Sequence, residues 1–299
     1  MLTLPKQVII MEKIKQFVKD VYNIYKTKNI PTYSAQCAFW IALSVIPFSM
    51  VVMLIFQALP FQPPDIAVYL ESYFPEDSYE LILSVVENLA RASNPVVLIV
   101  SIIGALWAAS RSMMAIRQGL NSVYGVKETR NYFYVRLLSL IYVFLFVLAI
   151  VLTMFFLVFG SRFYAKLVEF IPFLKTHDII YEGFKIFLTL IVLTLLFMAF
   201  YTYFSNQRQK FIFQFPGAVV AAAGWIISSY IFSLYFLYST NFTYLYGSLA
   251  GITMLLLWLV TCLYIFFIGA AVNSIRATYA KRRKREKYTE EDEYIGTDL

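Results

Sequence analysis

Residues 211–275 decide the fold class of this chain, and they read FIFQFPGAVVAAAGWIISSYIFSLYFLYSTNFTYLYGSLAGITMLLLWLVTCLYIFFIGAAVNSI, without a single Asp, Glu, Lys or Arg. A helix needs about 20 mostly apolar residues to cross the ~30 Å hydrocarbon core of a bilayer. These 65 residues are therefore too many for one span. Asn241 and Gly247 indicate where the chain turns back. The stretch predicts two consecutive transmembrane helices.

Four more stretches upstream carry no charge, namely residues 29–64, 92–110, 137–161 and 186–207. Hydrophobic residues make up 60% of the 299, whereas soluble domains usually contain about 45–50%. We therefore expect an all-α polytopic membrane protein with six transmembrane helices, at about 35–59, 94–115, 137–160, 184–205, 214–238 and 247–274. A cytoplasmic N-terminal segment (1–34) precedes the membrane domain (35–275), and a charged cytoplasmic tail (276–299) follows it.

Lys and Arg gather on alternate sides of these spans, which predicts their orientation because short cytoplasmic loops are rich in both residues. Of the 25 basic residues, 19 lie before span one or after spans two, four and six. The first outer loop instead holds six acids and only Arg91. Both termini should be cytoplasmic. The net charge of +7 then reflects topology, and we expect no nucleic-acid partner. The basic run 281–285 should bind anionic inner-leaflet headgroups, with RNA binding as the alternative.

Two segments outside the spans have amphipathic helical periodicity. Residues 6–28 predict a basic helix that lies either in the inner membrane interface or on the inner loops. In the outer segment 60–92, apolar residues from Leu81 to Leu89 share one face of a predicted helix. This outer helix should lie over the mouth of the bundle, where it either gates the bundle or only covers it.

The residue content argues against an enzyme. The chain has one histidine, His177, and two separated cysteines, Cys37 and Cys262, which cannot build a zinc site. Neither a phosphate-binding glycine loop nor a GxSxG nucleophile elbow occurs. We therefore expect no catalytic residues, no metal and no cofactor.

Within the spans, polar, aromatic and small residues stand out from the apolar background. Pro47 should kink span one, because it removes a backbone hydrogen bond. Arg111 either extends to the inner interface or faces inward to bind an anionic group. Asn273 either bonds across helices or caps the wet end of its span. The candidate substrate pathway is Ser44, Pro47, Trp107, Arg111, Asn121, Tyr246, Gly247, Gly251, Trp258 and Asn273. The candidate helix-packing residues, small enough for close approach, are Gly104, Ala108, Gly217, Ala221 and Gly224.

Several of these segments resemble the YihY / virulence factor BrkB family of bacterial inner-membrane proteins. The resemblance rests on AFWIALSVIP at 38–47, LWAASR at 106–111, Asn121 with Tyr124-Gly125, Pro216-Gly217-Ala218, YGSLA at 246–250 and GAAVN at 269–273. It implies a six-span helical bundle in the bacterial cytoplasmic membrane. Some members have carried the label ribonuclease BN, and others are associated with envelope properties and anionic lipids.

Three functions follow as hypotheses. The first is a transporter or lipid translocase for an envelope amphiphile, with membrane lipids as its partners. The second is a non-catalytic scaffold for envelope biogenesis, and the third, less favoured, is a membrane enzyme. Faces of small residues are compatible with a homo-oligomer without requiring one.

Overall fold

The computed structural model describes residues 6–58, 95–144, 178–207, 209–238 and 250–296. All regular structure in these ranges is helical, which confirms the predicted all-α class. The helices are α1 (Lys6–Thr27), α2 (Ile30–Ala58), α5 (Pro95–Tyr124), Tyr132–Phe144, α7 (Asp178–Ala199), the π-helix η2 (Phe200–Phe204), the 3-10 helix η3 (Phe211–Gln214), α8 (Phe215–Tyr238) and α10 (Ala250–Gly296).

Three helical segments among the described residues are long and apolar enough to cross a membrane: Ile186–Phe204, Phe211–Tyr235 and Gly251–Arg285. They fall on the predicted spans four, five and six. Helices α2 and α5 have 29 and 30 residues, and at about 1.5 Å per residue each exceeds the ~30 Å hydrocarbon thickness. The count of six spans stays a prediction, since most of span three and the outer segment 60–92 lie outside the described residues.

Helix α10 continues beyond the predicted end of span six. It runs 47 residues from Ala250 to Gly296 and carries the basic run 281–285 as helix. Lys, Arg and Glu are good helix formers, and no Gly or Pro interrupts the chain between Gly269 and Gly296. Nothing in this tail therefore stops the helix where the apolar residues end.

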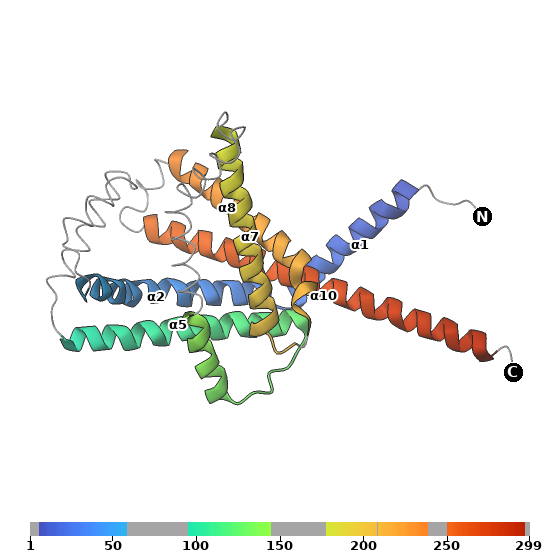
Figure 1. Cartoon of the computed structure of the whole chain (residues 1–299), viewed down its shortest axis with the longest axis horizontal. Coiled ribbons are helices and arrows are strands. Elements are labelled where there is room, and N and C mark those ends of the chain that lie inside the picture. Colours follow the sequence, from blue (N-terminus) through green and yellow to red (C-terminus); the bar gives the residue numbers. More distant parts are fainter. Residues whose placement is uncertain (1–5, 59–94, 145–177, 208, 239–249, 297–299) are drawn as a thin grey trace, which may run out of the picture.

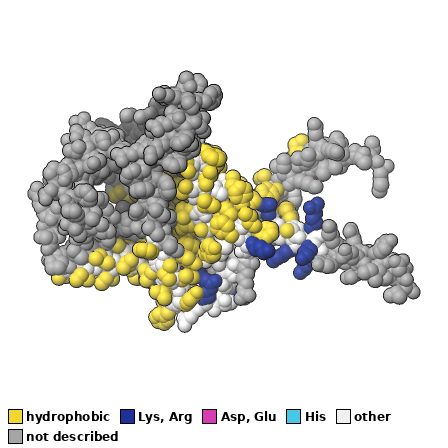
Figure 2. All heavy atoms as spheres, viewed as in Figure 1, with side chains coloured by type: hydrophobic (Ala, Val, Ile, Leu, Met, Phe, Trp, Pro, Cys, Tyr) yellow, Lys and Arg dark blue, Asp and Glu magenta, His cyan; other side chains and the backbone are white. Residues whose placement is uncertain are grey.

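Helix α1 and the C-terminal part of α10 leave the bundle at the same end (Figure 1). Exposed Lys and Arg side chains gather where they leave it, while the visible described surface of the bundle is mostly apolar (Figure 2). The exposed cations there include Lys26 and all five residues of the run 281–285. We call this the basic end. Its placement on the cytoplasmic side stays a prediction.

The core forms where α2, α5, α7 with η2, α8 and α10 meet. Helices α2 and α5 lie side by side and make the most extensive contact of any helix pair (Figure 1). Gly119 of α5 sits against α10, because a Cβ there would come within 2.5 Å of the Phe267 ring. At Gly217 of α8, a Cβ would come within 2.1 Å of the Gly269 carbonyl oxygen of α10. Glycine at these positions allows the backbones to approach closely.

Candidate functional site

A network of polar side chains lies near the basic end, where α5, α8 and α10 meet the link between η2 and η3. It consists of two clusters, each named here after its central asparagine. The Asn121 cluster comprises Arg117, Asn121, Glu128, Ser205 and Asn206. The Asn273 cluster comprises Tyr124, Gln214, Gly217 and Asn273.

The end of α5 brings the Asn121 cluster together. Gly125 has a φ of +66°, a left-handed conformation that favours glycine. Its N–H donates to the Ser122 carbonyl at 3.1 Å, and the Val126 N–H donates to the Asn121 carbonyl at 2.9 Å. This pair of bonds is the Schellman motif that ends many helices. It turns the chain so that Glu128, which is exposed, lies beside the buried Arg117.

Asn121 joins three parts of the chain. Its Nδ2 donates to Glu128 Oε2 at 3.0 Å, and its Oδ1 accepts Ser205 Oγ at 3.1 Å and the Asn206 N–H at 2.8 Å. Arg117 Nε donates to the same Glu128 oxygen at 2.7 Å. The carboxylate thus holds both α5 side chains in place.

The π-helix η2 positions the partners of Asn121. Short π-helical segments are rare and are often found at functional sites. Here the segment buries Tyr201, whose hydroxyl donates to the Phe266 carbonyl of α10 at 2.6 Å. The helix ends at Ser205, which has extended backbone, so Ser205 and Asn206 face α5. The widened turn anchors this link to α10 on one side and to α5 on the other.

The Asn273 cluster fastens α8 to α10. Asn273 Oδ1 accepts the Gly217 N–H at 2.8 Å, and its Nδ2 donates to the backbone and side-chain oxygens of Gln214, both at 3.0 Å. The Tyr124 hydroxyl donates to Gln214 Oε1 at 3.0 Å. Asn273 therefore bonds across helices, the first of its two predicted roles.

Arg117 is the unusual member of the network. It is 2% exposed, and its Nη1 and Nη2 have no hydrogen-bond partner among the described residues. An unsatisfied buried donor costs about 1–3 kcal/mol, and more when it is charged. Ser110 Oγ is likewise buried and unpartnered within the described ranges. Ser110, Arg117 and Asn121 are seven and four residues apart, so they lie on one face of α5. We call this the α5 polar face.

The predicted residue Arg111 lies elsewhere on α5, in an aromatic setting. Its guanidinium carbon is 5.4 Å from the Trp107 ring centroid, and Trp107 packs edge-on against Trp40 of α2 with centroids 5.3 Å apart. Arg111 Nε is buried and has no partner in the described part of the chain. The structure therefore places Trp107 and Arg111 together, on a half-exposed surface away from the Asn121 cluster.

The remaining pathway candidates that the structure describes lie on α2 and α10. Ser44 Oγ bonds its own helix at the Ile41 carbonyl, at 2.7 Å. Trp258 Nε1 donates to Ser229 Oγ of α8 at 3.3 Å, and no described residue lies within 4 Å of a Cβ placed on Gly251. Pro47 lies within α2, its side chain outside the description, and Tyr246 and Gly247 lie outside the described residues.

The predicted packing residues mostly line helix contacts. Gly217 and Ala221 face Gly269, and a Cβ at Gly224 would come within 2.6 Å of Ile265 Cγ2. Ala108 is buried, and Gly104 is half-buried.

Sequence reasoning missed most of the network. It counted Arg117 only among the basic residues that follow span two, and it gave no role to Glu128, Ser205, Asn206 or Gln214. One signal was available, because Ser110, Arg117 and Asn121 recur at helical spacing on a single face. The partners from η2 and η3 had no comparable signal, since they meet α5 only through tertiary packing.

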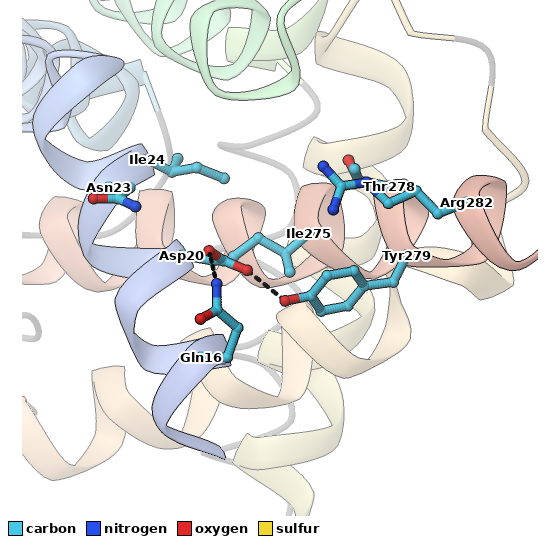
Figure 3. Close-up of a pocket in the computed structure, with 8 residues that line it drawn as sticks. All are labelled: Gln16, Asp20, Asn23, Ile24, Ile275, Thr278, Tyr279 and Arg282. Atoms are coloured by element: carbon cyan, nitrogen blue, oxygen red, sulfur yellow. Dashed lines mark hydrogen bonds between the residues drawn. The ribbon is translucent and has the colours of Figure 1, made fainter. Parts of the chain in front are cut away.

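A separate cavity of about 400 Å³ lies outside the bundle, between α1 and the extension of α10 (Figure 3). Asp20 of α1 accepts Gln16 Nε2 at 3.0 Å and the hydroxyl of Tyr279 of α10. Arg282 lines the same cavity. This contact joins the two helices that leave the basic end.

No three His, Cys, Asp or Glu side chains come together as a metal site in the ranges that the structure describes. The polar side chains of the Asn121 and Asn273 clusters are amides, hydroxyls and the Arg117–Glu128 pair. Such groups can bind and orient an anion.

Comparison with known proteins gives a family match. A family model described as virulence factor BrkB matches residues 21–293. YfkH of Bacillus subtilis (strain 168), whose name describes it as ribonuclease-like, is 29% identical over 278 residues, covering 93% of this chain and 99% of its own length. A UPF0761 membrane protein of Actinobacillus pleuropneumoniae is 23% identical over 282 residues, covering 90% of this chain and 96% of its own. No solved structure matches the chain significantly.

Proposed function

This chain belongs to the virulence factor BrkB family of membrane proteins, and from that premise we propose that it is a transporter or lipid translocase that moves an anionic amphiphile of the cell envelope. The proposal places it in the bacterial cytoplasmic membrane with six spans and both termini inside. Its partners are membrane lipids, and it acts without a cofactor.

The observation that carries this proposal is the buried guanidinium of Arg117, whose Nη1 and Nη2 have no partner among the described residues. Charged residues in membrane bundles are costly, and they commonly mark substrate or ion pathways. A structural role alone would favour full pairing, because each unsatisfied donor lowers stability. A passing anionic headgroup would supply the missing acceptors.

The α5 polar face gives such a headgroup a direction of movement. Ser110 lies 11 residues before Asn121 on the same face, so the face extends along about 16 Å of helix at about 1.5 Å per residue. A headgroup that enters near Asn121 would meet Arg117 and then Ser110. The acyl chains would stay in the surrounding lipid.

A flux assay tests the proposal. Purified protein in proteoliposomes should accelerate the movement of a fluorescent anionic phospholipid between leaflets, measured by dithionite quenching. Arg117→Ala should abolish this acceleration, while Lys127→Gln removes a nearby exposed charge and should keep it. If proteoliposomes that contain folded wild-type protein move the lipid no faster than empty liposomes do, the proposal is refuted. If Arg111→Ala and Arg111→Lys both match wild type, Arg111 has no part in binding the headgroup.

A scaffold is the second candidate, and the two helices that leave the basic end favour it. Large apolar side chains of α1 stay exposed, among them Val18 and Tyr22. They offer a surface to another envelope protein. Crosslinking in intact cells separates the candidates, because a stable partner without measurable flux supports a scaffold.

A nuclease is not proposed. The ribonuclease-like name belongs to YfkH, and the residues described here offer no cluster of metal ligands. Incubating the purified protein with RNA should leave the RNA intact, with and without added divalent cations.

A further inference from the structure

The Arg117 guanidinium has two hydrogen-bonding edges, and within the described ranges only one of them has a partner. Nε donates to Glu128 Oε2 at 2.7 Å. Nη1 and Nη2, which form the end of the group, are buried without a partner among the described residues. Two parallel N–H groups at this end match two oxygens of one carboxylate or phosphate.

The fork formed by Nη1 and Nη2 of Arg117 is held in one orientation before any ligand binds. Glu128 Oε2 accepts from both Arg117 and Asn121. Asn121 is fixed in turn by Ser205 Oγ and the Asn206 N–H. A preorganised donor pair binds more tightly, because less conformational freedom is lost on binding.

The local charge favours phosphate over carboxylate. Between residues 111 and 144 the chain has one acid, Glu128. Arg136 Nη1 lies 3.5 Å from the sulfur of Met114, one turn before Arg117 on α5. The backbone N–H of Arg130 donates to Glu128 Oε1 at 3.2 Å, so Arg130 lies beside the carboxylate that pairs with Arg117. Three arginines against one carboxylate leave a surplus of two positive charges, which inorganic phosphate or a phosphate monoester, with a charge of about −1.5 to −2, neutralises better than a singly charged carboxylate.

We propose that Nη1 and Nη2 of Arg117 bind a phosphate group, from a lipid headgroup or from free phosphate, with Arg130 and Arg136 supplying further positive charge. This inference deepens the proposed function. It rests on that function only in identifying the phosphate as the anionic group of the transported amphiphile. Glu128 keeps the Nε edge and orients the fork.

Isothermal titration of the full chain in dodecyl maltoside, which carries no phosphate, tests this site. The probes are inorganic phosphate, dihexanoyl phosphatidic acid and, as the carboxylate comparison, hexanoate. The variants are Arg117→Lys, which keeps the charge but removes the fork, and Lys127→Gln as the matched control.

Wild type and the control should bind a phosphate probe more tightly than hexanoate. Arg117→Lys should bind at least about tenfold more weakly, equivalent to about 1.4 kcal/mol. Tighter binding of the lipid indicates a headgroup, and equal binding of inorganic phosphate indicates free phosphate. Unchanged binding in Arg117→Lys, equally tight hexanoate, or no binding of either phosphate probe to folded wild type overturns the proposal.

A second measurement uses wild type alone, in case the variant does not fold. A photoactivatable short-chain phosphatidic acid should label peptides within residues 111–144, and excess dihexanoyl phosphatidic acid should prevent this. Labelling confined to other segments overturns the site. Phosphate binding without lipid movement contradicts the proposed function alone, whereas lipid movement that survives loss of phosphate binding contradicts this inference alone.

Discussion

The side-chain oxygen of Asn273 on α10 accepts the backbone N–H of Gly217 in the first turn of α8, at 2.8 Å. The first N–H groups of a helix have no partner within that helix. Asn273 therefore caps α8 from a different helix, 56 residues along the chain. The same amide holds Gln214, which comes immediately before α8.

Replacing Asn273 by alanine should destabilise the bundle by about 2 kcal/mol, because buried donors and acceptors at Gly217 and Gln214 lose their partner. Thermal unfolding in detergent measures the change. Thr278→Ala is the control on the same helix, since the Thr278 hydroxyl is exposed and bonds only its own helix at Ser274. Equal melting temperatures for wild type and Asn273→Ala would contradict the capping role.

Gly217→Ala should destabilise by about 1–3 kcal/mol, the usual range for overpacking. The added Cβ would lie 2.1 Å from the Gly269 carbonyl oxygen, and a backbone atom cannot move aside as a flexible side chain can. Gly251→Ala is the matched control, because no atom of the described residues lies within 4 Å of a Cβ there. The melting temperatures of the two variants and of wild type measure the effect. If Gly217→Ala melts at the wild-type temperature, α8 and α10 do not approach this closely.

The all-helical membrane class could be read from the uncharged stretches, because a lipid-facing helix must be apolar over its whole length. Arg117 shows why the site could not be predicted from the sequence. A basic residue just beyond a span fits an exposed cytoplasmic position, and only the turn at Gly125 brings Glu128 back to pair with it. The π-helix η2 has no periodic signature, so its alignment of Ser205 and Asn206 with Asn121 depends on packing that no local pattern contains. A bond from Asn273 across helices was one of its two predicted roles, but the sequence did not identify its partner Gly217 on α8.

Glu128→Gln should weaken the fold and strengthen phosphate binding at the same time. The amide keeps one oxygen for Asn121, but it leaves the Arg117 charge without a counter-charge, which should cost about 1–2 kcal/mol for a partly exposed pair. Removing a negative charge beside the fork should lower the dissociation constant for phosphate. Unfolding and titration together measure the two effects, with Glu12→Gln on α1 as an exposed control. Weaker phosphate binding in Glu128→Gln would mean that orienting Arg117 matters more than the local charge.

Tyr279→Phe should loosen α1 without unfolding the bundle. The Tyr279 hydroxyl donates to Asp20 across the cavity between α10 and α1, and the variant removes only that bond (Figure 3). Because α1 extends from the basic end with much of its surface exposed, few other contacts replace it. Hydrogen–deuterium exchange should become faster in residues 11–27, and Asp20→Asn should have a smaller effect, since an amide oxygen still accepts.

Tyr22→Phe is the matched control for that experiment. The Tyr22 ring stacks on Tyr25 with centroids 6.4 Å apart, a contact that phenylalanine keeps, and its hydroxyl bonds no other described residue. Exchange in α1 should therefore match wild type. If Tyr279→Phe behaves like Tyr22→Phe, the Asp20 bond does not hold α1 against α10. If exchange instead rises equally in α1 and in the α8–α10 contact, Tyr279 stabilises the whole bundle, and the two helices at the basic end do not move independently of it.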